Sequence, residues 1–303
     1  MKTIVGYLQD FFRHTNIKLT LTISLFAATL IFLNYYFRLY ITLYAPADFL
    51  PRFAGFFFLF TFVFSFSYLL GFLLQKKSFP TQPIFYILII AAPAIFALKI
   101  SFTTPLQLFS GVFSYPWDQY WKIVLQWPLK GIMACGLVLT CWFAGRYGRP
   151  IAGLSFANIS VRPYFLALAV MIPFITLAGT AADFQQAYPK LSHIDFIDGY
   201  TQQPWLPRIF FELCYGLDFF TIEFFFRGFL TLAFVRYAGK DAILPMAVFY
   251  CTIHFGKPLA ECISSYFGGI ILGVIIYHTR SVWGGLIAHL GIAWLMEIAG
   301  YFL

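Results

Sequence analysis

Charged side chains are scarce in this sequence: Asp, Glu, Lys and Arg together make up 11% of its 303 residues. Soluble domains carry about 25% charged residues, so the low content excludes an ordinary soluble fold. Hydrophobic residues instead reach 61% and aromatic residues 22%. Aromatic side chains suit lipid-facing and interfacial positions. The composition therefore predicts an all-α, polytopic integral membrane helical bundle with the lipid bilayer as its main partner.

The few cysteines and the surplus of basic residues both lack clustering. The five cysteines lie singly in or beside apolar segments, without the spacing of a zinc knuckle or a disulfide framework, so we expect free thiols. The net charge of +8 comes from basic residues scattered between apolar segments. Such residues are topology signals rather than a nucleic-acid patch. The sequence also has no repeat or low-complexity tract, so we treat residues 1–303 as a single membrane domain and leave the oligomeric state open.

Long apolar runs, by contrast, are abundant. A membrane helix needs about 20 mostly apolar residues. Two of the runs are short and interrupted by Pro93 and Pro245, so the sequence predicts eight or nine transmembrane helices. Before them, residues 1–18 mix charged and aromatic side chains, which predicts an interfacial N-terminal segment. The predicted spans are Leu19–Phe37, Ala54–Leu74, Ile84–Leu98, Leu129–Gly145, Tyr164–Ala181, Ile209–Tyr237, Ala242–Phe255, Leu259–His278 and Val282–Phe302.

Basic residues occupy every second connection between these runs. The positive-inside rule then places the N-terminus in the cytoplasm and the C-terminus outside. Short connections favour a bacterial inner (plasma) membrane. The residues that carry this bias are Lys76, Lys77, Arg146, Arg149, Arg162, Arg236, Lys240 and Arg280.

Four ionisable residues interrupt the last apolar runs. Glu223 and Arg227 lie one helical turn apart, and His254 and His289 lie in later segments. Ionisable side chains at membrane depth are costly and usually mark a functional interior. Counting about 1.5 Å per residue from the cytoplasmic helix ends puts Glu223 and His254 roughly 20 Å deep and His289 roughly 13 Å deep. We therefore expect them to meet in one layer of the bundle.

A carboxylate and two imidazoles on separate helices have the chemistry of a hydrolytic or metal site. Glu223, His254 and His289 could ligate one divalent ion, with zinc favoured, and such an ion would activate a bound water. Arg227 would pair with Glu223 and keep it ionised. The alternative is that the Glu–Arg pair neutralises itself and that both histidines are hydrogen-bonded core residues.

Three short motifs resemble those of the CPBP family of intramembrane proteases, which includes the CAAX prenyl endopeptidases. The family pattern is Glu-Glu-x-x-x-Arg, then Phe-x-x-x-His and His-x-x-x-Asn on later helices. The segment Thr221–Leu230 resembles the first motif, Tyr250–His254 the second with Tyr in place of Phe, and His289–Ala293 the third. The order, the gaps and the apolar setting all agree. The resemblance defines a motif-bearing core over residues 209–302.

The resemblance also implies roles for individual positions. In the family the first glutamate activates the attacking water, the histidines surround the water or metal, and the asparagine steadies the oxyanion. Here Glu223 aligns with the second glutamate, Ile222 takes the place of the first, and Ala293 takes the place of the asparagine. Asp218, one turn before Ile222, is a candidate for the missing base, and Glu223 itself is the other.

The fold and function implied by this resemblance are those of an intramembrane endopeptidase. It would hydrolyse a peptide bond of a hydrophobic or lipid-modified, CAAX-type substrate near the cytoplasmic side, using water activated by the glutamate and histidines. Glu261 and Glu297 are further carboxylates near the motifs. Because Ile222 and Ala293 depart from the pattern, a catalytically inactive membrane scaffold is the alternative. A small-solute transporter is disfavoured because the chain shows no duplicated halves.

Overall fold

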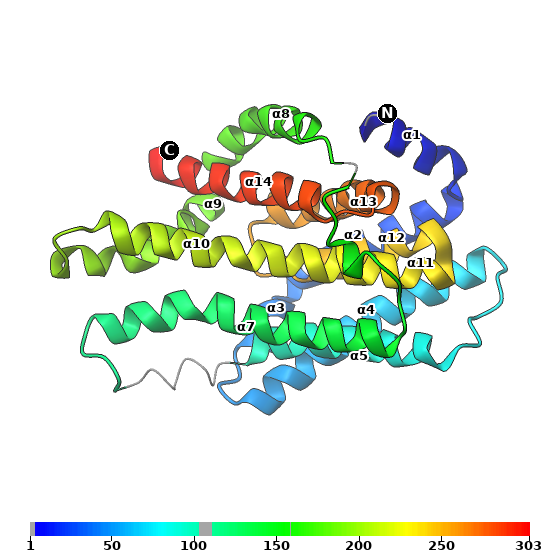
Figure 1. The fold of residues 1–303 in the computed structure, drawn as a ribbon, viewed down its shortest axis with the longest axis horizontal. Coiled ribbons are helices and arrows are strands. Elements are labelled where there is room, and N and C mark those ends of the chain that lie inside the picture. Colours follow the sequence, from blue (N-terminus) through cyan, green and yellow to red (C-terminus); the bar gives the residue numbers. More distant parts are fainter. Residues whose placement is uncertain (1–3, 103–110, 158) are drawn as a thin grey trace.

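Within residues 4–102, 111–157 and 159–303, which the computed structural model describes, every regular element is a helix. Figure 1 shows these helices packed side by side in a bundle, which confirms the predicted all-α, polytopic architecture. The first three residues of the predicted interfacial segment lie outside the described ranges. Residues 4–14 form the amphipathic helix α1 (Ile4–His14), which buries Phe11 and exposes Val5 and Phe12, and residues 17 and 18 already belong to the next helix.

Seven helices in the described part of the chain are long and apolar enough to cross a membrane. Many of their large apolar side chains are exposed, which is the arrangement expected for helices surrounded by lipid. The seven are α2 (Ile17–Phe37), α4 (Phe49–Leu74), α5 (Pro83–Ser101), α7 (Trp117–Ala144), α8 (Arg162–Gly179), α13 (Leu259–Thr279) and α14 (Trp283–Phe302). The two other predicted spans, 209–237 and 242–255, correspond to elements of a different kind.

The first of these is a composite helix. Figure 1 shows α10 (Trp205–Ile222) continuing into α11 (Leu232–Ala238) along one axis, and the π-helical segment η3 (Glu223–Thr231) joins them. All nine residues of η3 are buried. Short π-helical segments are rare and often lie at functional sites. The change of helix type therefore begins at the residue that the sequence marks as the candidate acid.

The second is α12 (Ile243–Thr252), which is too short to span a bilayer by itself. All ten of its residues are buried, because α2, α4, α13 and η3 pack around it. The helix ends before His254, whose backbone N–H donates to the Cys251 carbonyl in a turn. The predicted span 242–255 is therefore a central core helix followed by a turn.

Aromatic packing fixes η3 against α12. Phe225 and Phe226 lie against Phe249 of α12 and Phe96 of α5, with ring centroids 5.1 to 6.1 Å apart. Tilted and edge-on ring pairs at these separations are favourable. With these rings on the α5 side, Glu223 faces α14.

Short elements complete the fold. Tyr7 of α1 stacks on His278 of α13 at a centroid separation of 4.5 Å, so α1 is anchored to the bundle. The segment between α8 and α10 folds back over the end of α14, where it contacts Glu297. The remaining short elements are α3 (Leu39–Tyr44), η1 (Ile151–Gly153), α9 (Ala182–Ala187), η2 (Lys190–Tyr200) and η4 (Gly239–Ala242).

Candidate active site

Glu223 and His289 are in direct contact. The Nδ1 atom of His289 lies 2.9 Å from Oε1 of Glu223, and because a carboxylate can only accept, the imidazole donates. The Glu223 side chain is fully buried and that of His289 is 13% exposed. One turn before His289, the backbone of Gly285 lies so close to Oε2 of Glu223 that a Cβ atom would overlap it. A glycine at this position thus lets α14 approach η3 closely enough for the contact.

Tyr250 extends this contact on the other side of the imidazole. Its hydroxyl lies 3.0 Å from Nε2 of His289. With the proton of the neutral imidazole on Nδ1, Nε2 is an acceptor, so the Tyr250 hydroxyl donates to it. Tyr250 lies on α12 and is only 4% exposed. Glu223, His289 and Tyr250, from three elements of the fold, therefore form one continuous hydrogen-bonded chain.

Arg227 contacts two members of this hydrogen-bonded chain. Its guanidinium carbon lies 3.7 Å from the centre of the Tyr250 ring, and its Nη1 atom lies 3.5 Å from Oε1 of Glu223. Its three side-chain nitrogens, like Oε2 of Glu223, have no hydrogen-bond partner within the described residues. Buried polar atoms without partners are uncommon in proteins and call for an explanation such as a ligand or a catalytic role. We refer to Glu223, Arg227, Tyr250 and His289 as the inner cluster.

His254 joins the inner cluster through the backbone of Tyr250. Its Nδ1 atom donates to the Tyr250 carbonyl at 2.9 Å, and the two rings meet at a centroid separation of 4.6 Å. This hydrogen bond fixes the tautomer with the proton on Nδ1, so Nε2 of His254 carries the lone pair. His254 is partly exposed, unlike Tyr250, because it lies in the turn after α12.

Asp218 lies outside the inner cluster. Its carboxylate forms an ion pair with Nζ of Lys99 at 2.7 Å, on the side of α10 that faces α5. Five residues separate Asp218 from Glu223, which is about 140° around a helix. Within the described residues, no ion pair or hydrogen bond connects Asp218 to the inner cluster. Its role as the missing base stays a prediction, and the Lys99 contact accounts for it as a structural ion pair.

The two departures from the family pattern have apolar surroundings. Ile222 packs partly buried against the main hydrophobic core. Ala293 is 5% exposed and lies in an apolar cluster with Phe211, Tyr215 and Phe219. Neither position brings a polar group to the inner cluster.

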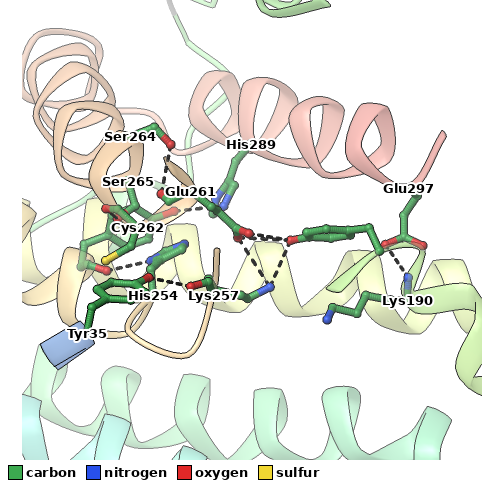
Figure 2. Close-up of polar contacts among 12 residues, drawn as sticks. Tyr35, Lys190, His254, Lys257, Glu261, Cys262, Ser264, Ser265, His289 and Glu297 are labelled. Carbon is green, nitrogen blue, oxygen red and sulfur yellow. Dashed lines mark hydrogen bonds and ion pairs between the residues drawn. The ribbon is translucent and has the colours of Figure 1, made fainter. Parts of the chain in front are cut away.

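A second group of polar residues, which we call the outer cluster, lies between η2 and the start of α13 (Figure 2). It consists of Tyr188, Lys190, Lys257, Glu261 and Glu297. The Tyr188 hydroxyl lies 3.1 and 3.0 Å from the two oxygens of Glu261. Lys257 donates to the Tyr188 oxygen at 3.1 Å and lies 3.5 Å from the Glu261 carboxylate.

Glu297 has a capping role in the outer cluster. Its two carboxylate oxygens accept the backbone N–H groups of Lys190, at 2.9 Å, and of Leu191, at 3.1 Å. Burial, followed by the nearby charge of Lys257, lowers the pKa of Lys190 to about 8. All four carboxylate oxygens of Glu261 and Glu297 thus have partners, in contrast with Oε2 of Glu223.

The donors in the inner cluster do not fit a metal ion as they lie. Both ring nitrogens of His289 are engaged, by Glu223 and by Tyr250. His254 uses Nδ1 for the Tyr250 carbonyl. No three His, Cys, Asp or Glu side chains in the described part of the chain are placed to share a metal ion. We therefore derive no chemical step through a metal, and the expected zinc ion stays a prediction.

Sequence reasoning missed two contributors to this site. Tyr250 occupies a position where the family pattern has Phe, and that substitution was the available signal for a new hydroxyl. Gly285 is one of several glycines in the last span, and no sequence pattern shows which of them faces a carboxylate.

Comparison with known proteins identifies the segment that carries the site. Residues 204–295 match the family model described as Rce1-like, type II CAAX prenyl endopeptidase Rce1-like. The matched segment runs from the start of α10 into α14 and contains the whole inner cluster and His254. This match confirms the resemblance predicted from the three motifs. Searches of curated proteins and of solved structures returned no match.

Proposed function

We propose that this integral membrane protein is an intramembrane endopeptidase of the CAAX type. Its substrate would be a hydrophobic or prenylated peptide that enters from the bilayer, on the cytoplasmic side of a bacterial inner membrane. One observation carries the proposal: Glu223, His289 and Tyr250 form a buried hydrogen-bonded chain beside polar atoms that have no partner. The Rce1-like match over the same residues supports this class of reaction.

In the proposed reaction, the Glu223–His289 pair takes the proton of the attacking water. The water first replaces the Tyr250 O–H at Nε2 of His289, because this nitrogen has a single lone pair. The water oxygen then bonds to the scissile carbonyl carbon while its proton passes to Nε2. Glu223 stabilises the resulting imidazolium through the 2.9 Å contact with Nδ1, as a buried carboxylate does in other hydrolases. The carbon–nitrogen bond then breaks, and Nε2 returns the proton to the leaving nitrogen.

Arg227 and His254 both support this step. The Arg227 guanidinium lies 3.5 Å from Glu223 and holds the carboxylate in place beside His289. His254 holds its Nδ1 proton on the Tyr250 carbonyl, so its free Nε2 can accept a hydrogen bond from water or substrate. In this scheme neither Asp218 nor a metal ion is needed.

The test is hydrolysis of a farnesylated peptide with a C-terminal CAAX sequence by the protein in liposomes, with both products identified by mass spectrometry. We expect Glu223→Gln to reduce kcat by about 10³- to 10⁴-fold, because the amide cannot stabilise the imidazolium. Glu297→Gln, a carboxylate-to-amide change in the outer cluster, serves as the matched control and should keep the wild-type rate.

A catalytically inactive scaffold is the competing candidate. The observation in its favour is the apolar surroundings of Ala293 and Ile222, at positions where the family pattern has polar residues. A wild-type protein that is folded in liposomes but cleaves no prenylated peptide would favour the scaffold.

A further inference from the structure

The proposed proton transfer assigns no catalytic role to the Tyr250 hydroxyl of the inner cluster. It is buried, it lies 3.0 Å from the nitrogen that takes the proton, and it has a cation 3.7 Å from the centre of its ring. A tyrosine that only filled space would need no hydroxyl here. The phenylalanine in the corresponding position of the motif pattern would pack equally well against His254 and under Arg227.

Hydrolysis of a peptide bond also requires a hydrogen-bond donor for the carbonyl oxygen. This oxygen becomes negatively charged when water adds to the carbon, and a positioned donor at that point is usually one of the largest contributions to catalysis. On α14, the residue one turn after His289 is Ala293, whose methyl group packs among Phe211, Tyr215 and Phe219. The helix that supplies the base therefore supplies no side-chain donor at the next turn.

We propose that Tyr250 is a catalytic residue whose hydroxyl donates a hydrogen bond to the oxygen of the scissile carbonyl. The inference rests on the proposed function and assigns the oxyanion donor within it. In the resting site, the Tyr250 O–H donates to Nε2 of His289. Because Nε2 has a single lone pair, the attacking water can hydrogen-bond to it only after the Tyr250 O–H has turned away.

This exchange frees the Tyr250 O–H before the water adds to the carbonyl carbon. The carbonyl π electrons move onto oxygen as the water oxygen bonds to carbon, and the freed O–H turns to that oxygen. Tyr250 keeps its proton throughout, and the proton on Nε2 later leaves with the amine. The guanidinium of Arg227 over the ring strengthens the hydroxyl as a donor, because a nearby cation polarises the O–H bond.

The Tyr250→Phe variant tests this role while keeping the ring, and thus the packing under Arg227. We expect kcat for the farnesylated peptide to fall about 10²- to 10³-fold, the loss seen when one oxyanion donor is removed, with little change in KM. The matched control is Tyr68→Phe on α4. Tyr68 is also buried, at 4% exposure, its hydroxyl has no hydrogen-bond partner within the described residues, and it should tolerate the change.

A thioamide at the scissile bond separates a catalytic role from a structural one. Sulfur accepts hydrogen bonds poorly, so the wild-type enzyme should lose much of its rate on the thioamide. Tyr250→Phe should lose far less, because it has already lost the donor. A variant as active as wild type on the normal peptide, or one that keeps the full thioamide penalty, would overturn the role of Tyr250. Failure of the wild-type protein to cleave either peptide would instead overturn the proposed function and, with it, this inference.

Discussion

The inner and outer clusters each combine a tyrosine, at least one carboxylate and at least one cationic side chain, but they differ in how completely the carboxylate oxygens are paired. In the outer cluster, each oxygen of Glu261 and Glu297 has a donor from the protein. In the inner cluster, one oxygen of Glu223 and three nitrogens of Arg227 have no hydrogen-bond partner in the described part of the chain. Both groups lie close to the last two membrane helices, but the inner cluster is the more deeply buried: the side chains of Arg227 and Glu223 are 1% and 0% exposed, against 29% and 15% for Lys257 and Glu261.

The contrast indicates which cluster serves the fold and which serves chemistry. A fully paired buried network is stabilising and specifies one conformation, whereas a partly paired one is costly unless another molecule completes it. The unpaired atoms of the inner cluster therefore support our proposal that a substrate or water binds there. The outer cluster holds η2 against α13 and α14.

The largest effect is expected when the buried charges of the inner cluster are separated. Arg227→Met leaves the fully buried Glu223 carboxylate without its cation, which should lower the free energy of unfolding by about 3–5 kcal/mol. The measurement is equilibrium unfolding in mixed detergent micelles. Arg236→Met, at an exposed position where Nη1 donates to the Gly145 carbonyl, is the control and should cost about 1 kcal/mol or less.

A smaller effect is expected from adding a methyl group where α14 lies against Glu223 of η3. In Gly285→Ala, the new methyl group would overlap Oε2 of Glu223 and push the carboxylate away from His289. Overpacking of this kind costs about 1–3 kcal/mol of unfolding free energy, and the cleavage rate should fall with it. Gly268→Ala on α13 is the control, since its methyl group would meet no atom within 4 Å. Equal cleavage rates for the two variants would contradict the close contact.

In the outer cluster we expect a loss of stability without a loss of activity. Glu297→Ala leaves the backbone N–H groups of Lys190 and Leu191 without their acceptor, which should lower the free energy of unfolding by about 1–3 kcal/mol. The kcat of the remaining folded protein should stay at the wild-type value. A loss of kcat comparable to that of Glu223→Gln would show that the two clusters are not separate in function.

The smallest effect is expected from metal removal. No three His, Cys, Asp or Glu side chains in the described part of the chain are placed to share an ion, so we expect the site to act without one. Purified protein should contain far less than one equivalent of zinc, and a chelator should leave the cleavage rate unchanged. Near-stoichiometric zinc that disappears in both His254→Ala and His289→Ala would contradict this account and support the metal site predicted from the sequence.

Much of the architecture follows from composition and periodicity alone. The apolar runs predict helices because, in lipid, each segment must form the hydrogen bonds of its backbone N–H and C=O groups internally. The depth estimate predicts Glu223, His254 and His289 in one layer. In the structure Glu223 contacts His289, and His254 connects to this pair through Tyr250. Hydropathy could not show that residues 243–252 form a short core helix, because a buried helix and a membrane span are equally apolar.

The finer arrangement of the site could not be predicted, since it depends on which helix faces meet. The Lys99–Asp218 ion pair joins residues more than a hundred positions apart, and neither the charge pattern of α5 nor that of α10 specifies it. The same holds for Gly285, whose importance comes from a carboxylate on another helix. The hydroxyl of Tyr250 was visible in the sequence, but its contact with His289 required the positions of both helices.

The most direct test of the account is the cleavage rate of the farnesylated peptide by wild-type protein and by His289→Gln, measured in the same liposomes. A glutamine side chain can still hydrogen-bond Glu223 and Tyr250, but it cannot take a proton from water. We expect cleavage by the wild type and a loss in kcat of about 10³-fold or more in the variant. Equal rates for the two proteins would show that His289 is not the base and would contradict the proposed chain of Glu223, His289 and Tyr250.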